Sequence, residues 1–160
     1  MYSTEAPKGL TLTSRAFTEG QTLRRTYTGD GADVSPALQW RGAPPDVKSF
    51  AVICTDLDAP GGSFIHWVVY NIPGTASGVP EGLPRQERLD DGTIQGKNDF
   101  GGIGYRGPKP PPGGAHEYHF DLYVIDSMLP AEPGVSAARL QELMNGHILA
   151  TAKLMGTYRR

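Results

Sequence analysis

The sequence predicts a mainly β protein made of two packed antiparallel sheets, with one or two short helices near the C-terminus. Apolar runs of strand length follow one another along the 160 residues without helical patterns between them, which disfavours parallel strands joined by crossover helices. The 21 glycines and 14 prolines are spread through the chain, as in proteins rich in turns. This length is enough for a real core, so we expect residues 1–160 to form a single domain.

Five segments in the first half of the chain are candidates for strands. Residues 10–14 alternate leucine and threonine, residues 24–28 are a weaker candidate, and residues 37–40 end before a run of turn-forming residues. Residues 49–56 are continuously apolar and rich in β-branched side chains, which predicts a central strand covered on both faces. Residues 64–72 form the next strong strand, which a Pro-Gly pair ends.

The second half predicts fewer strands and contains the helical patterns. Residues 74–92 are expected to be irregular, residues 93–95 a short strand, and residues 116–126 the last long strand before the C-terminal region. Ser136 as N-cap and Gly146 as stop enclose an amphipathic helix at residues 136–145. We expect residues 147–152 to add a helical turn or two and residues 153–159 to form a final strand, although the latter pattern fits either helix or strand.

Residues 96–115 combine a glycine-rich half with a proline-rich half, directly before the strand that begins at His116. Glycines let the backbone approach a ligand closely and prolines fix φ, so a loop of this kind can hold several backbone N–H groups toward an anion. A plain surface connection between two strands is the simpler interpretation of such a loop. The polar residues on either side of the loop favour the first interpretation.

The alternation of side chains along the strand from His116 separates two histidines. His116 and Tyr118 share a mainly apolar face and lie next to the loop, whereas His119 lies on the opposite face between two carboxylates. We therefore interpret His119 as a solvated surface residue. His66 stands at the mouth of the strand 64–72, where a histidine is more often a satisfied core residue than a ligand.

Asp56 and Asp58 end the central strand, close to His66, His116 and Tyr118 at neighbouring strand ends. Ordinary turn chemistry explains two aspartates at such a position equally well. Taken together, however, these residues can bind a phosphate, because a carboxylate near an imidazole favours the cation. A cationic histidine, a phenol O–H and loop N–H groups can each donate to phosphate oxygens. A carboxylate at the rim can accept from an ammonium group, so a phosphate head group that carries an amine fits this set.

Composition limits the other kinds of site. A net charge of −2 gives no general attraction to nucleic acid or to an anionic membrane. The single cysteine, Cys54, lies in an apolar run and is expected to be a buried thiol, which leaves no intramolecular disulfide and no cysteine metal cluster. No apolar run approaches the ~20 residues of a membrane-spanning helix, and the first residues lack a secretory pattern. We expect a cytoplasmic protein without a cofactor.

Several motifs, in order from about residue 18 to 159, resemble the phosphatidylethanolamine-binding proteins, also called Raf-kinase-inhibitor-like proteins, and their bacterial branch in particular. Each motif is weak alone, but several in register are specific. The motifs are Val-Ser-Pro at 34–36 with Trp40, Asp-Leu-Asp-Ala-Pro at 56–60, His-Trp-Val-Val-Tyr-Asn-Ile-Pro at 66–73, Gly-Lys-Asn-Asp-Phe-Gly at 96–101, Gly-Tyr-Arg-Gly-Pro-Lys-Pro-Pro-Pro-Gly at 104–113, residues 116–120, and Gly-His-Ile-Leu-Ala and Gly-Thr-Tyr near the C-terminus.

The resemblance implies a central antiparallel sheet packed on a second one, with a small anion pocket at one end. It also implies a cis bond between Ala59 and Pro60. Leu57 stands where the family has proline, which puts the placement of Asp58 in question more than that of Asp56. Lys109 stands where bacterial relatives often carry cysteine, and it either attracts an anion at the rim or is simply solvated, which we favour. The implied pocket residues are Asp56, Asp58, His66, Pro110, Pro111, His116 and Tyr118.

These observations predict a non-enzymatic binding protein for phosphate-type anions or phospholipid head groups, with a possible regulatory role toward a partner protein such as a kinase or a protease. The alternative is a phosphoester hydrolase, in which Asp and His act as acid and base or two of each hold a divalent metal. The sequence has no Gly-x-Ser-x-Gly elbow and no His-Glu-x-x-His pair. The resemblance makes a homodimer plausible, but no pattern identifies an interface.

Overall fold

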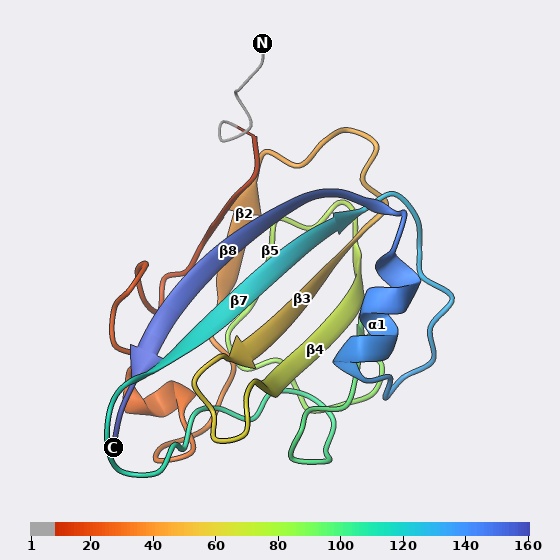
Figure 1. Cartoon of the computed structure of the whole chain (residues 1–160). Coiled ribbons are helices and arrows are strands. Elements are labelled where there is room, and N and C mark those ends of the chain that lie inside the picture. The colour runs from red at the N-terminus through yellow and green to blue at the C-terminus, as the bar shows by residue number, and fades with distance from the viewer. Residues whose placement is uncertain (1–8) are drawn as a thin grey trace.

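Two antiparallel sheets pack against each other in the computed structural model, which describes residues 9–160 (Figure 1). The larger sheet has the strand order β6-β4-β3-β7-β8 and the smaller sheet the order β1-β2-β5. All pairings between these strands are antiparallel, so the predicted fold class is confirmed. The strands are β1 (Thr11–Thr13), β2 (Leu38–Arg41), β3 (Ser49–Asp56), β4 (Phe64–Pro73), β5 (Gly78–Val79), β6 (Ile94–Gln95), β7 (His116–Ile125) and β8 (Ile148–Tyr158).

Large apolar side chains fill the space between the two sheets. Alternate residues of β7, among them Tyr118 and Phe120, are buried there and confirm the predicted alternation of that strand. The Phe120 ring packs against Phe17 with centroids 5.6 Å apart, and Trp40 from the smaller sheet packs against Phe50 from the larger one at 4.9 Å. These contacts join the two sheets through one core.

A second apolar layer covers the other face of the larger sheet. The helix α1 (Ala137–Met144) buries Leu140 and Met144 in the same cluster as residues of β3 and β4, and Figure 1 shows it lying beside β4. Ser136 caps this helix, because its hydroxyl accepts from the Arg139 N–H at 3.1 Å. The predicted helix and its N-cap are therefore confirmed, as is the prediction that β3 is covered on both faces.

Two predictions of secondary structure are wrong. Residues 24–28 were expected to form a strand but contain the short 3₁₀ helix η2 (Arg25–Tyr27), in which Tyr27 N–H donates to the Arg24 carbonyl at 3.0 Å. Residues 147–152 were expected to be helical, but from Ile148 onward they form the first half of β8, which pairs with β7. Short apolar patterns do not separate helix from strand, and here the pairing with β7 satisfies the backbone.

The bond between Ala59 and Pro60, expected to be cis, is trans, as are all peptide bonds within residues 9–160. Trans is the lower-energy form even before proline. The Gly62 N–H donates to the Ala59 carbonyl at 3.0 Å, and Gly61 has a φ of 85°. Residues 59–62 thus form a β-turn with proline second and a positive-φ glycine third, an arrangement that suits a trans proline.

Cys54 lies within β3 and is only 1% exposed, as predicted. Burial raises the pKa of its thiol well above the usual value. Among the helices of the described residues, none is long and apolar enough to cross a membrane.

Candidate functional site

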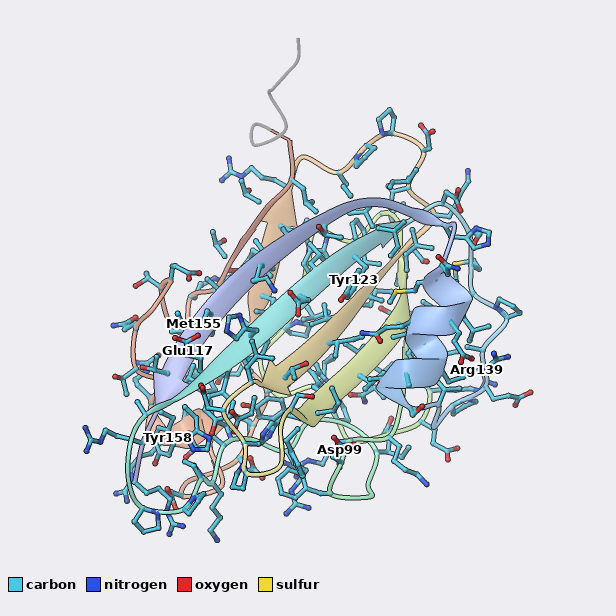
Figure 2. The ribbon with its side chains drawn as sticks, viewed as in Figure 1. Asp99, Glu117, Tyr123, Arg139, Met155 and Tyr158 are labelled. Carbon is cyan, nitrogen blue, oxygen red and sulfur yellow. The ribbon has the colours of Figure 1, made fainter. Side chains whose placement is uncertain are left out.

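The antiparallel order of β4, β3 and β7 brings the predicted site residues to one end of the larger sheet. β3 ends at Asp56, β4 begins at Phe64, and β7 begins at His116. Asp56 is paired in register with Phe64 on one side and with Tyr118 on the other. Asp99 and Tyr158 lie at this same end of the molecule, as Figure 2 shows.

A cavity of about 140 Å³ opens between these strand ends and the proline-rich loop. Its walls include six of the seven residues that the sequence indicated: Asp56, His66, Pro110, Pro111, His116 and Tyr118. Five further residues complete the walls: Ala59, Pro60, Phe64, Phe100 and Lys109. The cavity has room for a phosphate-sized group.

Asp56 and His116 form a hydrogen-bonded pair in the wall of this cavity. His116 Nδ1 and Asp56 Oδ2 are 2.7 Å apart, and both side chains are largely buried. The other carboxylate oxygen of Asp56 accepts from the Asp58 N–H at 2.8 Å, which fixes its orientation. The Asp56 carboxylate therefore fixes the orientation of the His116 ring and leaves Nε2 for another partner.

His66 is held differently. Its Nδ1 lies 2.6 Å from the carbonyl oxygen of Arg106, and the Arg106 N–H donates back to the His66 carbonyl at 3.1 Å. Because a carbonyl can only accept, Nδ1 carries the proton and Nε2 presents a lone pair when the ring is neutral. Burial lowers the pKa of His66, so the neutral form prevails at neutral pH.

Tyr118 stands between the two histidines. Its ring centroid is 5.3 Å from that of His66, in an edge contact, and 6.4 Å from that of His116, in a nearly parallel arrangement. Burial, together with the neighbouring Asp56 carboxylate, raises the pKa of Tyr118 far above its usual value. The phenol therefore remains protonated, and its O–H lies within hydrogen-bonding reach of the Asp56 carboxylate.

Asp58 is the one predicted site residue that does not line the cavity. Its carboxylate accepts from the Glu117 N–H at 2.8 Å and so ties the end of β3 to the start of β7. The neighbouring Leu57 side chain is 53% exposed. Asp58 is thus engaged in a backbone contact at the edge of the site.

His119 lies on the opposite face of β7, as the alternation predicted, but it is not freely solvated. Its side chain is only 14% exposed, and Nε2 lies 3.1 Å from Glu117 Oε1. Its Nδ1 is the one fully buried side-chain nitrogen or oxygen without a partner in residues 9–160. Packing on that face therefore shields a ring that we expected to find in water.

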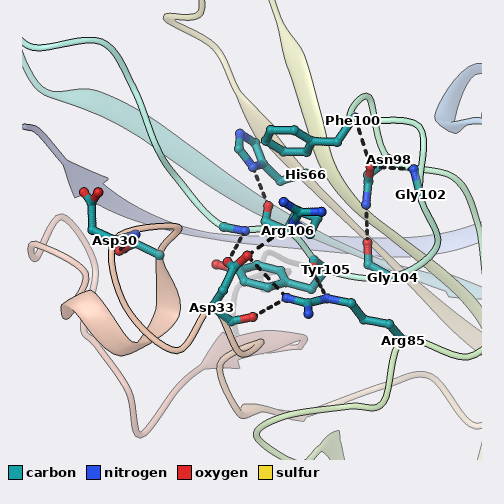
Figure 3. Close-up of polar contacts among 12 residues, drawn as sticks. Asp30, Asp33, His66, Arg85, Asn98, Phe100, Gly102, Gly104, Tyr105 and Arg106 are labelled. Atoms are coloured by element: carbon teal, nitrogen blue, oxygen red, sulfur yellow. Dashed lines mark hydrogen bonds and ion pairs between the residues drawn. The ribbon is translucent and has the colours of Figure 1, made fainter.

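The glycine-rich half of the loop is ordered mainly by Asn98. The Asn98 side-chain oxygen accepts from Phe100 N–H at 2.9 Å and from Gly102 N–H at 3.2 Å, while its amide donates to the Gly104 carbonyl at 2.8 Å (Figure 3). These N–H groups are therefore engaged within the loop and do not face an anion. The loop contributes side chains to the cavity wall, chiefly Phe100. The Phe100 ring packs edge-on against the rings of Phe64 and His66, with centroids 4.9 Å and 5.5 Å apart.

Sequence reasoning did not identify Asp33, whose carboxylate holds the loop segment that contacts His66. Its carboxylate accepts from the Gly107 N–H at 2.6 Å and lies 3.3 Å from both Arg85 and Arg106 (Figure 3). A side chain at position 107 would not fit, since a Cβ there would lie 2.2 Å from the Tyr27 carbonyl oxygen. Asp33 thereby holds the Arg106–Gly107 peptide, whose carbonyl accepts from His66.

Phe64 and Phe100 were also missed, although a signal for each exists. Phe64 shares the face of β4 that carries His66, and Phe100 is a bulky aromatic residue within a glycine-rich loop. Lys109, for which we favoured simple solvation, is exposed and also lines the cavity. No signal in the Gly-Asp-Gly-Ala-Asp stretch distinguishes Asp33 from an ordinary turn residue.

A larger groove of about 650 Å³ runs beside β2 and β5, but its chemistry is less specific. Its buried phenol, Tyr27, already donates to Glu81 at 2.6 Å. Within the described residues, no set of three or more His, Cys, Asp or Glu side chains comes together as metal ligands would. The small cavity is therefore the strongest candidate for a functional site.

The chain is similar to proteins of one family along nearly its whole length. The family profile described as phosphatidylethanolamine-binding protein matches residues 13–159. A UPF0098 protein of Methanothermobacter thermautotrophicus is 47% identical over 151 residues, which cover 94% of this chain and 99% of that protein. A UPF0098 protein of Pyrococcus horikoshii is 43% identical over 150 residues, which cover 92% of this chain and 75% of that protein.

Solved structures show the same likeness. A phosphatidylethanolamine-binding protein homologue from Chlamydia trachomatis matches with a TM-score of 0.87 and 39% identity, covering 95% of this chain and 98% of its own. YbcL of E. coli, described as a member of the mammalian family of these proteins, matches with a TM-score of 0.88 and 34% identity, covering 94% of this chain and 98% of its own.

Proposed function

The chain belongs to the phosphatidylethanolamine-binding protein family, and from this premise we propose that it is a non-enzymatic binding protein whose cavity takes a phosphate-type anion or a phospholipid head group. The observation that carries the proposal is the convergence of His66, His116 and Tyr118 on a phosphate-sized cavity. The hydrogen bond from His116 Nδ1 to Asp56 Oδ2 fixes this ring and leaves its Nε2 for a bound anion.

Donors to an anion come from side chains around the cavity. His116 offers Nε2–H when its ring is positively charged, and Lys109, an exposed residue of the cavity wall, carries an ammonium group. The Tyr118 O–H, which is within reach of the Asp56 carboxylate, can turn to a bound anion instead. Pro60, Pro110 and Pro111 restrict the backbone around them, so little conformational entropy is lost when a ligand binds. A small anion that accepts several hydrogen bonds fits this arrangement.

Calorimetric titration at pH 6.5 with inorganic phosphate and with phosphoethanolamine tests the proposal. We expect saturable binding of one anion per chain, and crystals soaked with either compound should show it between His66, His116 and Tyr118. The absence of saturable binding for both compounds, together with an empty cavity in soaked crystals, would show that the proposal is wrong.

A regulatory role toward a protein partner is the second part of the proposal. The family is also called Raf-kinase-inhibitor-like, and a phosphate group carried by a kinase or by a protease would reach the same cavity. A titration with a phosphorylated peptide against its unphosphorylated form tests this part. Equal binding of both forms would contradict it.

The Asp56–His116 pair also supports a second candidate function, since the same arrangement serves as a general base in hydrolases. A phosphoester hydrolase would release phosphate from p-nitrophenyl phosphate with multiple turnovers, with or without an added divalent metal. Loss of that activity in His66→Ala and His116→Ala, with His119→Ala fully active, would establish the hydrolase. We expect no turnover.

A further inference from the structure

We propose that a groove between the end of β8 and the short helix η2 is a second anion site, separate from the strand-end cavity, and that it takes ligands with two or more linked phosphate groups. The groove has a volume of about 800 Å³, and four arginines line it: Arg24, Arg25, Arg159 and Arg160. Asp30 has the only acidic side chain among the described residues that line it. This inference goes beyond the proposed function and does not depend on it.

Backbone pairing brings two pairs of arginines together from opposite ends of the chain. Thr22 forms a parallel bridge with Thr157, and the Leu23 N–H donates to the Thr157 carbonyl at 2.8 Å. Because the bridge is parallel, residues 24–25 and 159–160 leave it in the same direction, and each pair begins two residues beyond it. Figure 1 shows the end of β8 beside the short helix η2, which is drawn in orange.

Packing beneath this bridge holds the two segments in place. Leu23 is 1% exposed and lies directly over Gly156, where a Cβ would be 2.9 Å from the Leu23 Cδ2 atom. The glycine at position 156 therefore lets the two segments approach each other closely. The exposed arginines are thus carried by backbone that the core keeps in one arrangement.

The positive charge of the groove exceeds what its one carboxylate can neutralise. Asp30 Oδ2 accepts from the Tyr158 hydroxyl at 2.8 Å and lies 3.3 Å from Arg160 Nε, so this carboxylate is already engaged. The other three arginines are exposed, and none of them forms an ion pair with a carboxylate within residues 9–160. Three guanidinium charges therefore remain available to an anion, although the net charge of the chain is −2.

The size and the donors of the groove indicate the class of ligand. A guanidinium group presents a planar fork that donates two parallel hydrogen bonds to a phosphate. The groove is far larger than the strand-end cavity of about 140 Å³, so a single phosphate would contact only some of the arginines. Two or three linked phosphates can accept hydrogen bonds from both arginine pairs at once.

Two of the arginines are partly ordered before a ligand binds. The guanidinium carbon of Arg24 lies 5.8 Å from the centroid of the Tyr27 ring, and Asp30 holds Arg160. Less side-chain entropy is therefore lost on binding than with four freely rotating side chains.

The experiment compares tripolyphosphate, ATP and inorganic phosphate by calorimetric titration of the full chain without divalent metal. A salt concentration of about 0.15 M screens attraction between exposed charges beyond about 8 Å. We expect tripolyphosphate to bind saturably and at least about tenfold more tightly than phosphate, because it gains at least one more charge-assisted contact. A similar affinity for ATP would show that the phosphate chain is bound whatever carries it, whereas binding of tripolyphosphate alone would indicate a free phosphate chain. Equal affinities for tripolyphosphate and phosphate would overturn the inference.

Two double variants with the same change in charge test the position of the site. Arg24→Gln/Arg159→Gln removes one arginine from each pair and should weaken tripolyphosphate binding about 100-fold, or about tenfold for each lost contact. Arg41→Gln/Arg139→Gln removes two exposed arginines outside the groove and should stay within about twofold of wild type. Figure 2 shows Arg139 on the opposite side of the molecule from Tyr158. Equal losses in the two double variants, both folded in a thermal scan, would contradict the inference.

His116→Ala separates this site from the strand-end cavity. Because His116 does not line the groove, this variant should bind tripolyphosphate within about twofold of wild type. A loss as large as that in Arg24→Gln/Arg159→Gln would place the ligand in the cavity and overturn the inference, while leaving the proposed function standing.

Discussion

Replacing His116 with alanine is expected to weaken phosphate binding by about 10- to 100-fold without unfolding the chain. The anion loses one charge-assisted hydrogen bond, worth about 1.5–3 kcal/mol, and each 1.4 kcal/mol is about a factor of ten in affinity. A second effect acts in the same direction. Asp56 is 4% exposed and would keep the Asp58 N–H and the Tyr118 phenol as partners, but its buried negative charge would lose the His116 ring near the anion.

The cost to stability should be moderate, since His116 is the first residue of β7 and packs at the edge of the core. Loss of the partner of a buried carboxylate costs about 1–3 kcal/mol, which corresponds to a fall in Tm of roughly 2–12 °C for a chain of this size. Calorimetric titration with phosphate measures the affinity, and far-ultraviolet circular dichroism with a thermal scan measures the fold.

His119→Ala is the matched control. It removes an imidazole from the same strand but from the opposite face, where Nε2 contacts Glu117. Phosphate affinity should stay within about twofold of wild type, which is below the cost of one hydrogen bond. Equal losses in the two variants would refute the assignment of His116 to the cavity. In the double variant Asp56→Asn/His116→Ala, part of the lost affinity should return, because the unpaired negative charge is gone.

Three further predictions concern stability and reactivity. Burial lowers the pKa of His66, so the unfolded chain takes up a proton near pH 6.5 that the folded chain takes up only at lower pH. The free energy of unfolding should therefore fall as the pH drops below about 6.5. The curve of urea midpoint against pH should be flatter for His66→Gln than for His147→Gln, which changes an exposed histidine. Identical curves for the two variants would contradict this. The Cys54 thiol, with its raised pKa and 1% exposure, should react with a thiol reagent only as fast as the chain opens, so rapid labelling of the native protein would refute the described burial. Phe120→Ala should cost about 3–5 kcal/mol in urea unfolding, whereas Leu57→Ala at an exposed position should stay within about 0.5 kcal/mol, and a similar cost for both would argue against the core described here.

The parts of the fold that could be predicted are those in which local pattern and burial agree. β3 runs from Ser49 to Asp56 in the structure, as its continuous apolar sequence indicated, because a strand covered on both faces leaves no polar position inside it. The error at residues 147–152 has a physical cause. Short segments adopt the conformation that their distant partners allow, and for Ile148 that partner is Ile125 across the β7–β8 ladder.

The site residues also divide into those that the sequence could place and those that it could not. His116 and Tyr118 could be placed together from the alternation of one strand, and Asp56 and His66 could be added because antiparallel neighbours end side by side. Asp33 could not be found, since it acts on Gly107, 74 residues further along the chain, through a contact that no local pattern records. Nor could the sequence show that the Asp58 carboxylate accepts from the Glu117 N–H instead of lining the cavity.

The two cavity histidines differ in the partner of their Nδ1 atom, a difference that the sequence does not show. Each uses Nδ1 for a short contact, at 2.7 Å with the Asp56 carboxylate for His116 and at 2.6 Å with the Arg106 carbonyl for His66. Burial lowers the pKa of His66, because a neutral carbonyl does not outweigh the cost of desolvating a charged ring.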